Sequence, residues 1–356
     1  MHSPYSALPP RNFWKSGVSQ QNPFTINNLY KKKFNIGRKT RIATGGSCFA
    51  QHISRYLRNL DFHIIDAEPP PPGLETDLAK EFGYLLYSAR YGNIYVVRHL
   101  LQLAKEAYGL FKPENWIWQK DGRFYDAIRP SVEPTGLEKA EDITRYREHH
   151  IGKVRTVFDN ADLFIFTLGL TESWIDKSSG TAYPTAPGTI AGDFNGNAFE
   201  FKNFTFTEIL NDFLEFRNLL RQHNPTVKFL LTVSPVPLTA TATANHVLAA
   251  TTYSKSVLRA VAGQLCDMFE DVDYFPSYEM VASPFSRGMF YEQNLRSVTD
   301  MGVQAVMRVF LEEHVGGQDS TTSIPAMVTS VQTAGSAQKS EDDIVCEDIL
   351  LEAFAT

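Results

Sequence analysis

The segment from Arg41 to Ala50 constrains the fold more than any other part of the chain. A short apolar run ends at Gly45-Gly46, and helix-like spacing of apolar residues begins after Ser47-Cys48. Glycine takes positive φ without steric cost, so a buried strand can turn sharply there into a helix. The free N–H groups and positive dipole end of that helix favour a thiolate, an alkoxide or an oxyanion. We therefore predict a nucleophile site at Ser47-Cys48. The alternative is a structural glycine turn with a small buried cysteine.

Apolar strands alternate with amphipathic helices along the middle of the chain. Runs rich in β-favouring residues, typical of strands buried on both faces, occur at 41–46, 62–65, 162–167, 227–233 and 272–275. Helical periodicity occurs at 143–158, 206–222, 253–269 and 299–311. This order predicts an α/β fold over residues 41–314, with a doubly wound, flavodoxin-like and mostly parallel sheet flanked by helices.

The remaining segments differ in composition from this core. Residues 1–40 lack periodicity and are expected to form an arm packed on the domain through Phe13, Trp14, Phe24 and Tyr30. Residues from about 75 to 150 are expected to be a helical insertion that caps the site. Residues 315–340 are rich in Ser, Thr, Gln, Gly and Ala, which predicts a disordered linker. Residues 341–356 form an acidic amphipathic segment, expected to dock on the domain or to bind a protein partner.

Composition excludes several classes of protein. A formal net charge of −6 argues against a nucleic-acid binder, which normally carries a basic face. The three cysteines lie far apart, and neither zinc nor calcium spacing is present, so we expect no disulfide framework, metal or bound cofactor. The sequence shows no signal-peptide pattern and no apolar run of the roughly twenty residues that span a bilayer. We expect a cytoplasmic protein without membrane insertion.

The string Gly46-Ser47-Cys48-Phe49-Ala50 resembles the signature of the GSCFA family, whose members are similar to SGNH hydrolases and acyltransferases. The resemblance continues in the family's order at 167–174, 232–236 and 253–255, with a further match at 4–11. It implies an SGNH-type fold and ester chemistry on carbohydrate-linked acyl groups such as acetyl. It also implies an acyl donor such as acetyl-CoA as co-substrate if the protein is a transferase.

The resemblance also implies roles for residues at the strand ends. Cys48 stands where the usual Gly-Asp-Ser block has its serine nucleophile, and Ser47 stands where it has aspartate. Ser47 remains an alternative nucleophile, because a small change in turn geometry would exchange the two side chains. Gly169 and Thr171 match the block that helps to form the oxyanion hole, with Thr171 in place of asparagine. The alternative is that Thr171 and Glu172 cap the segment that follows.

The general base is the part of the pattern that departs from the family. Related hydrolases carry Asp-x-x-His before the last helix, but Arg296 stands at the histidine position, and arginine does not act as a base at neutral pH. Our candidate base is His246, in the loop after Ser234-Pro235; a solvent-facing loop histidine is the alternative. His52 lies one helical turn after Cys48, where it orients the thiol or simply packs.

The other candidates are substrate-binding residues. Ser234 and Glu172 follow strand ends, which meet at one rim of a parallel sheet. Lys255 and Arg296 are predicted to bind a phosphate or carboxylate, while Ser254 binds substrate or caps a helix. An aromatic wall for a sugar ring is expected from Trp174, Tyr183 and Phe285.

The sequence therefore predicts an esterase or O-acyltransferase acting through a covalent acyl-enzyme. One alternative is a catalytically inactive module that binds a glycan or acyl group. Another is a scaffold in polysaccharide biosynthesis whose segment 344–354 recruits a partner protein.

Overall fold

The computed structural model describes residues 3–314 and 347–355. The segment 315–340, predicted to be a linker, and the first part of the acidic segment 341–356 lie outside the described residues. Within those two ranges, every helix is too short or too polar to cross a membrane.

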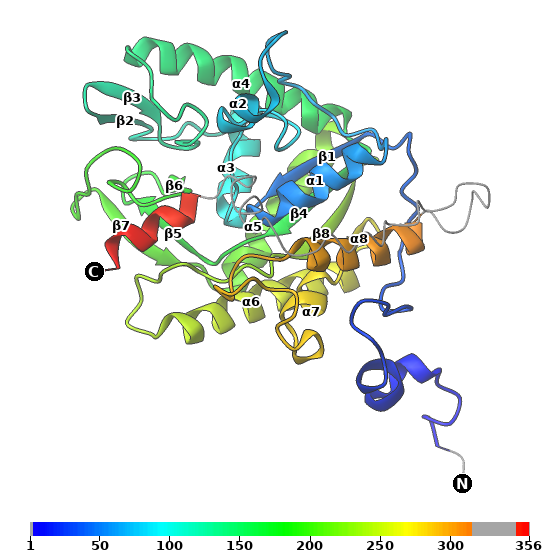
Figure 1. Cartoon of the computed structure of the whole chain (residues 1–356). Helices are drawn as coiled ribbons and strands as arrows, with labels where there is room; N and C mark the ends of the chain where they lie inside the picture. Colours follow the sequence, from blue (N-terminus) through cyan, green and yellow to red (C-terminus); the bar gives the residue numbers. More distant parts are fainter. Residues whose placement is uncertain (1–2, 315–346, 356) are drawn as a thin grey trace.

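A four-stranded parallel sheet forms the centre of the domain (Figure 1), with strand order β1-β4-β8-β9. Its strands are β1 (Ile42–Gly46), β4 (Leu163–Leu168), β8 (Lys228–Val233) and β9 (Val272–Tyr274). The strand expected at 62–65 is reduced to one parallel bridge, between Ile64 and Ile42 at the outer edge of β1. The chain thus leaves β1 toward one edge and leaves β4 toward the other, which places a topological switch point between these two strands.

Both faces of this sheet are buried, as its apolar strands predict. Successive strand residues point to opposite faces. Phe164 and Phe166 of β4 enter one core with α3, α4, α5 and α6, whereas Leu163 and Ile165 enter a second core with α1, α7 and α8. The helices are α1 (Phe49–Asn59), α2 (Thr76–Glu81), α3 (Val97–Ala107), α4 (Ala140–Asn160), α5 (Phe206–His223), α6 (Val247–Met268), α7 (Ser277–Ala282) and α8 (Asp300–His314), with a short 3₁₀ turn, η3 (Pro284–Ser286). This arrangement confirms the predicted doubly wound α/β fold.

The insertion at 75–150 is only partly helical, which corrects the sequence expectation. Besides α2, α3 and the start of α4, it contains an antiparallel hairpin of β2 (Ile117–Lys120) and β3 (Arg123–Asp126). Asp121 and Gly122 connect the strands with φ of 50° and 73°. An Asp-Gly pair with two positive φ values is a preferred two-residue hairpin turn. The Asp-Gly dipeptide at 121–122 therefore indicates a hairpin from the sequence alone.

A second, antiparallel sheet follows β4 and was not expected from the sequence. It has the order β6-β5-β7, with β5 (Glu172–Asp176), β6 (Ala182–Tyr183) and β7 (Phe199–Asn203). Trp118 of the hairpin packs against Tyr183 of β6, with 5.3 Å between the ring centroids. The inserted hairpin and this small sheet therefore share a third core.

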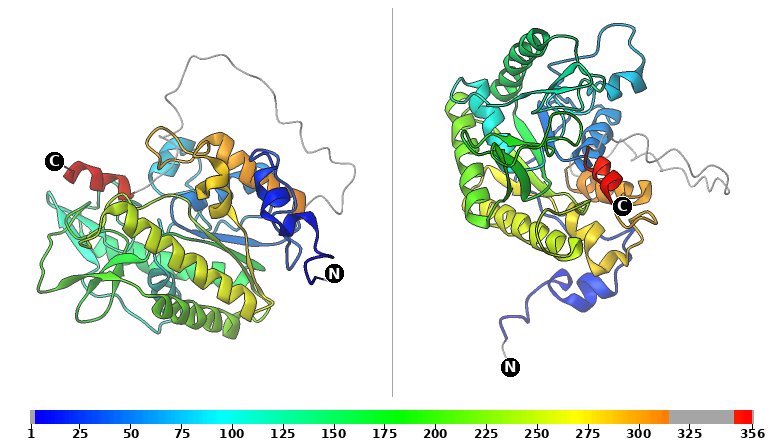
Figure 2. Two further views of the ribbon diagram at one scale, coloured as in Figure 1. Left: turned by 90° about the horizontal axis from the view of Figure 1, so that it is seen from below. Right: turned by 90° about the vertical axis from the view of Figure 1, so that its left-hand side faces the viewer.

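The N-terminal arm is anchored by its second half. Tyr30 is buried, and its hydroxyl donates a 2.6 Å hydrogen bond to Asp273 at the end of the central sheet. Phe24 packs edge-on against Phe290. The first half holds a 3₁₀ turn, η1 (Pro10–Asn12), and a π-helical turn, η2 (Lys15–Ser19), and it projects from the body (Figures 1 and 2). Phe13 and Trp14 are 40% and 70% exposed, so the prediction that they anchor the arm is wrong.

The described part of the C-terminal segment is a 3₁₀ helix, η4 (Glu347–Phe354). Leu351 lines a pocket formed by β5, β6, β7 and the loop after β8. Leu350 and Phe354 are 45% and 66% exposed. The Leu351 side chain of this helix thus contributes to the wall of that pocket.

Candidate active site

The turn after β1 and the loop after β4 touch each other at the switch point. Gly46 has a φ of 135°, and a Cβ on it would lie 2.5 Å from the carbonyl oxygen of Thr167. A Cβ on Gly169 would lie 2.9 Å from both the Ser47 Cβ and the Tyr95 carbonyl oxygen. Contacts this short do not occur for real side chains, so both positions require glycine in this geometry. Two of the sequence motifs are therefore in direct contact.

Both candidate nucleophiles lie at this junction. Ser47 is buried, and its Oγ has no hydrogen-bond partner among the described residues. Its carbonyl oxygen accepts hydrogen bonds from the Ala50 N–H at 2.8 Å and the Tyr87 hydroxyl at 3.1 Å. Cys48 is 5% exposed and occupies the N-cap position of α1. The strand, turn and helix predicted for this segment are thus present.

The irregular segment from Tyr87 to Tyr95 supports both loops, a role that sequence reasoning missed. The Ile94 N–H donates to the Gly46 carbonyl, and the Leu170 N–H donates to the Tyr95 carbonyl, each at 2.8 Å. The Asn93 side chain accepts hydrogen bonds from Tyr87 and from Gln51 of α1. This stretch belongs to the insertion that the sequence analysis predicted to be helical, whereas the structure shows no helix between residues 82 and 96.

Two side chains of helix α6 fix the loop that follows β4. The Ser254 hydroxyl accepts the Thr171 N–H at 3.1 Å, and the buried ammonium of Lys255 donates to the Gly169 carbonyl oxygen at 2.7 Å. These contacts give Ser254 and Lys255 a positioning role at the loop, and their role in substrate binding stays a prediction. The Thr171 hydroxyl oxygen is buried and lacks a hydrogen-bond partner within the described part of the chain.

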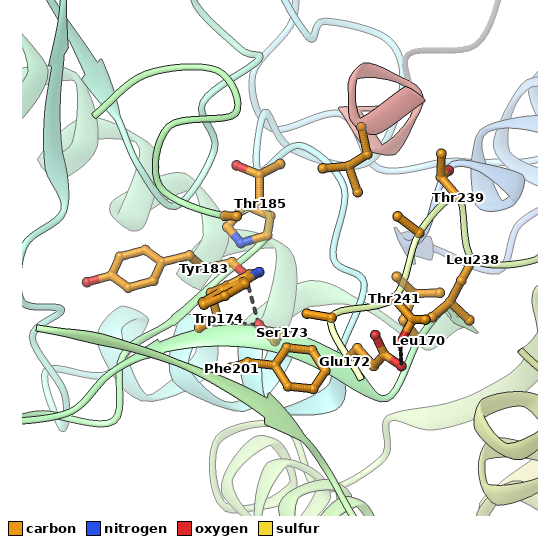
Figure 3. A pocket seen from close by; sticks show the side chains of 15 residues that line it. Leu170, Glu172, Ser173, Trp174, Tyr183, Thr185, Phe201, Leu238, Thr239 and Thr241 are labelled. Atoms are coloured by element: carbon orange, nitrogen blue, oxygen red, sulfur yellow. Dashed lines mark hydrogen bonds between the residues drawn. The ribbon is translucent and has the colours of Figure 1, made fainter. Parts of the chain in front are cut away.

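Glu172 and Ser234 lie at the same rim of the sheet. The Ser234 N–H bonds to the Leu168 carbonyl at 2.8 Å, and its hydroxyl accepts the Val236 N–H, so Ser234 shapes the end of β8. Glu172 opens β5 and accepts a 2.8 Å hydrogen bond from Thr241. Burial raises the pKa of Glu172, while the Thr241 bond acts in the opposite direction. Glu172 lines the pocket that begins beyond Gly169 (Figure 3).

His246 is exposed and caps a helix, whereas the sequence analysis placed it within a loop. Helix α6 begins at Val247 instead of near Tyr253, and the exposed His246 is its N-cap, where Nδ1 accepts the Leu248 N–H at 3.1 Å. An accepting Nδ1 selects the neutral tautomer with its proton on Nε2. In this geometry the ring has no lone pair available to take a proton.

His52 and Arg296 are engaged in their own local structures. The His52 Nδ1 lies 3.2 Å from the Arg55 guanidinium, and burial and Arg55 lower the pKa of His52 to about 3. The backbone of Arg296 is held by a 2.9 Å bond from its N–H to the Asn294 side chain. This loop reaches the end of β8 through a 2.7 Å bond from the Tyr291 hydroxyl to the Pro235 carbonyl oxygen.

The arrangement suits chemistry at a carbonyl carbon. A buried hydroxyl and a thiol lie at a helix start, beside a loop whose backbone is fixed and whose Thr171 hydroxyl is unpartnered within the described residues.

Across residues 3–314 and 347–355, no group of three or more His, Cys, Asp or Glu side chains is placed to hold a metal ion. Of the expected aromatic wall, Trp174 and Tyr183 line the pocket, whereas Phe285 packs against the second core.

Comparison with protein families gives a match over most of the domain. A model described as the GSCFA family matches residues 41–310, which contain every strand of the central sheet and the two glycine-containing loops. No curated protein matches the sequence.

Replacing Gly169 tests the contact between the two loops. We expect Gly169→Ala to lower the free energy of unfolding by about 1–3 kcal/mol, because the new Cβ overlaps Ser47 and Tyr95. Gly152→Ala is the matched control: it lies in α4, and a Cβ there would meet no atom within 4 Å. That change should stabilise the protein by about 0.5–1 kcal/mol. Urea denaturation measures both, and equal shifts in the two variants would contradict the contact.

His52 should make stability depend on pH. Its pKa of about 3 in the folded protein lies below the unfolded value near 6.5, so the unfolded chain alone takes up a proton as the pH falls below 6.5. Its contribution to stability is therefore lost as the pH falls from about 6.5 toward 3.

At pH 5 the loss due to His52 should reach about 2 kcal/mol, and His52→Gln should remove that part of the pH dependence. His149→Gln, at an exposed position of α4, serves as the control and should keep the wild-type dependence. The measurement is the unfolding free energy at pH 7 and pH 5. An unchanged difference in His52→Gln would show that this imidazole is not buried in the neutral form.

Proposed function

Because this chain belongs to the GSCFA family, we propose that it is an SGNH-like esterase or O-acyltransferase. We propose that its substrates are carbohydrate-linked acyl groups such as acetyl. Cys48 is the proposed nucleophile, with Ser47 as the alternative. The observation that carries the proposal is the contact between Ser47 and Gly169 at the switch point between β1 and β4.

The proposed reaction has two steps through a covalent intermediate. The Cys48 sulfur attacks the acyl carbonyl carbon, a C–S bond forms, and the ester C–O bond breaks as the sugar oxygen leaves with a proton. Water or an acceptor hydroxyl then attacks the thioester carbonyl, releases the acyl group and returns the proton to the sulfur. Water gives hydrolysis and an acceptor hydroxyl gives transfer. With Ser47 as nucleophile, the same steps proceed through an oxygen ester.

The loop at Gly169 is the proposed oxyanion hole. Backbone N–H groups near Gly169 and Cys48, together with the Thr171 hydroxyl, which has no partner among the described residues, would stabilise negative charge on the carbonyl oxygen. Each such donor is typically worth about 2.7–4 kcal/mol of the activation barrier. Lys255 and Ser254 support the hole by fixing the loop's backbone.

His246 is the proposed base, under one structural condition. Its Nδ1 must release the Leu248 N–H before the ring can accept a proton. The first residues of α6 therefore have to rearrange when the substrate binds. His246→Ala would remove both the base and the helix cap, so the variant tests them together.

The engagement of His246 and His52 favours a second candidate function. A protein with the same cleft and without a base would be a catalytically inactive module that binds a glycan or acyl group. It would serve as a binding protein or as a scaffold in polysaccharide biosynthesis, with the C-terminal segment 341–356 as a contact for a partner protein. Such a module would form no covalent intermediate.

Intact-mass spectrometry after exposure to p-nitrophenyl acetate tests the enzyme proposal. The wild-type protein should gain one acetyl group, Cys48→Ala should lose the adduct, and His246→Ala should form it more slowly. Cys266→Ala is the control for nonspecific acylation, because Cys266 is the other cysteine among the described residues and lies in α6. The same experiment with acetyl-CoA in place of the ester tests the proposed donor of a transferase.

Each outcome separates the candidates. An adduct that persists in Cys48→Ala and disappears in Ser47→Ala would reassign the nucleophile to Ser47. An adduct lost only in Cys266→Ala would place the reaction outside this site. A folded wild-type protein that forms no adduct would favour the binding module.

A further inference from the structure

A small cavity opens directly beyond the loop at Gly169. It has a volume of about 200 Å³, and its lining begins at Leu170 and Glu172. The small sheet supplies one wall, the loop 238–242 supplies the opposite wall, and Leu351 contributes from the C-terminal helix (Figure 3). The volume is below the usual 300–1,000 Å³ of drug-sized sites, so a single ring-sized group is the expected occupant.

One wall of the cavity is aromatic. Trp174 of β5 is paired with Tyr183 of β6 on one side and with Phe201 of β7 on the other. Residues directly opposite each other in an antiparallel sheet project from the same face. The Tyr183 ring is buried against Trp118 in the third core, so Trp174 and Phe201 supply the rings of this wall. The Trp174 and Phe201 rings are 5.8 Å apart and meet edge to face. Such a surface contacts the C–H face of a ligand ring.

Glu172 places a carboxyl group beside these rings. It lies two residues before Trp174, on the same face of β5. One of its oxygens accepts the hydroxyl of Thr241, so the carboxyl group is held at the side of the cavity opposite the β6 strand (Figure 3). Its remaining lone pairs can accept hydroxyl donors from a ligand.

Two threonine hydroxyls at the cavity lack partners among the described residues. The Oγ1 atoms of Thr185 and Thr239 are buried and form no hydrogen bond within that part of the chain. Thr185 is 7% exposed as a whole residue. A buried hydroxyl without a partner is unfavourable, and rotation about χ1 moves the hydroxyl of a threonine to another staggered position. A ligand with hydroxyl groups would provide the missing partners.

The charge of the lining restricts the ligand further. None of the described residues that line the cavity is Lys or Arg, and Glu172 is the ionisable acid among them. A phosphate or carboxylate in the cavity would lie near Glu172 without a compensating cation, which is unfavourable in a partly buried site.

We infer that this cavity binds an uncharged sugar ring, stacked on Trp174 and Phe201, with hydroxyl groups bound by Glu172, Thr185 and Thr239. The inference deepens the proposed function and rests on it, because it assigns the carbohydrate part of the ester to a defined set of residues. The lining includes Leu170, the residue after Gly169, and Gly169 packs against Ser47, so we place the attached acyl group on the side of the cavity toward the Ser47-Cys48 turn.

An organic cation such as choline is the main competing ligand. It would also contact aromatic rings and a carboxylate. A quaternary ammonium group donates no hydrogen bond, however, and would leave the Thr185 and Thr239 hydroxyls without a partner among the described residues. The two hydroxyls therefore favour the sugar.

Direct binding to the full-length protein tests the inference. Saturation-transfer NMR and titration would use the methyl glycosides of glucose, galactose, mannose and N-acetylglucosamine. Methyl glucuronide tests the charge argument, and choline tests the cation. At least one neutral glycoside should bind, more tightly than glucuronide and choline.

Two variants locate the site. Trp174→Ala should weaken glycoside binding by about tenfold or more, whereas Trp14→Ala, on the exposed part of the arm, should leave it unchanged. Glu172→Gln keeps the shape and a hydrogen-bonding oxygen but removes the charge, so glucuronide should bind this variant more tightly than it binds the wild type. Circular dichroism checks that each variant is folded, and Glu172→Gln remains informative if Trp174→Ala does not fold.

Three results would overturn the inference: no neutral glycoside binds, glucuronide or choline binds the wild type at least as tightly, or Trp14→Ala weakens binding as much as Trp174→Ala. The acetyl adduct of the wild-type protein, formed with a sugar-free ester, tests the covalent chemistry separately. Glycoside binding without an adduct would keep the cavity assignment and remove the ester chemistry. An adduct without glycoside binding would do the reverse.

Discussion

The close approach of two backbone loops at the switch point is the constraint on which the candidate site depends. Gly169 lies against Ser47 because neither it nor Gly46 carries a Cβ, and a methyl group at either position would meet an atom at 2.5–2.9 Å. The loop after β4 is in turn fixed by Tyr95 on one side and by Lys255 and Ser254 on the other. The proposed nucleophile, the proposed oxyanion donors and the cavity therefore share one structural support.

The central sheet and this junction follow from local sequence. The run 162–167 is apolar between its polar ends, which suits a strand between two cores, and β4 occupies nearly the same residues. The glycines at 45, 46 and 169 lie at or just after the ends of such strands, and parallel strands end at one rim. The adjacency of β1 and β4 in the sheet places the two motifs next to each other.

Other parts depended on contacts that local patterns do not encode. The stretch from Tyr87 to Tyr95 is not helical, because its polar groups bond to distant parts of the chain, including β1 and the two loops. Helix α6 begins at Val247 and is capped by His246, whose imidazole takes the role that sequence rules give to Ser, Thr, Asp or Asn. The cavity arises from cross-strand pairing of Trp174 with Tyr183 and Phe201, which are separate in sequence.

The most direct test of the account is a crystal structure of the protein after reaction with an activated acetyl ester. We predict an acetyl group on Cys48, or on Ser47, with its carbonyl oxygen within hydrogen-bond distance of the loop that contains Gly169 and Thr171. An acetyl group on Cys266 or on a surface lysine, with the Ser47-Cys48 turn unmodified, would contradict it.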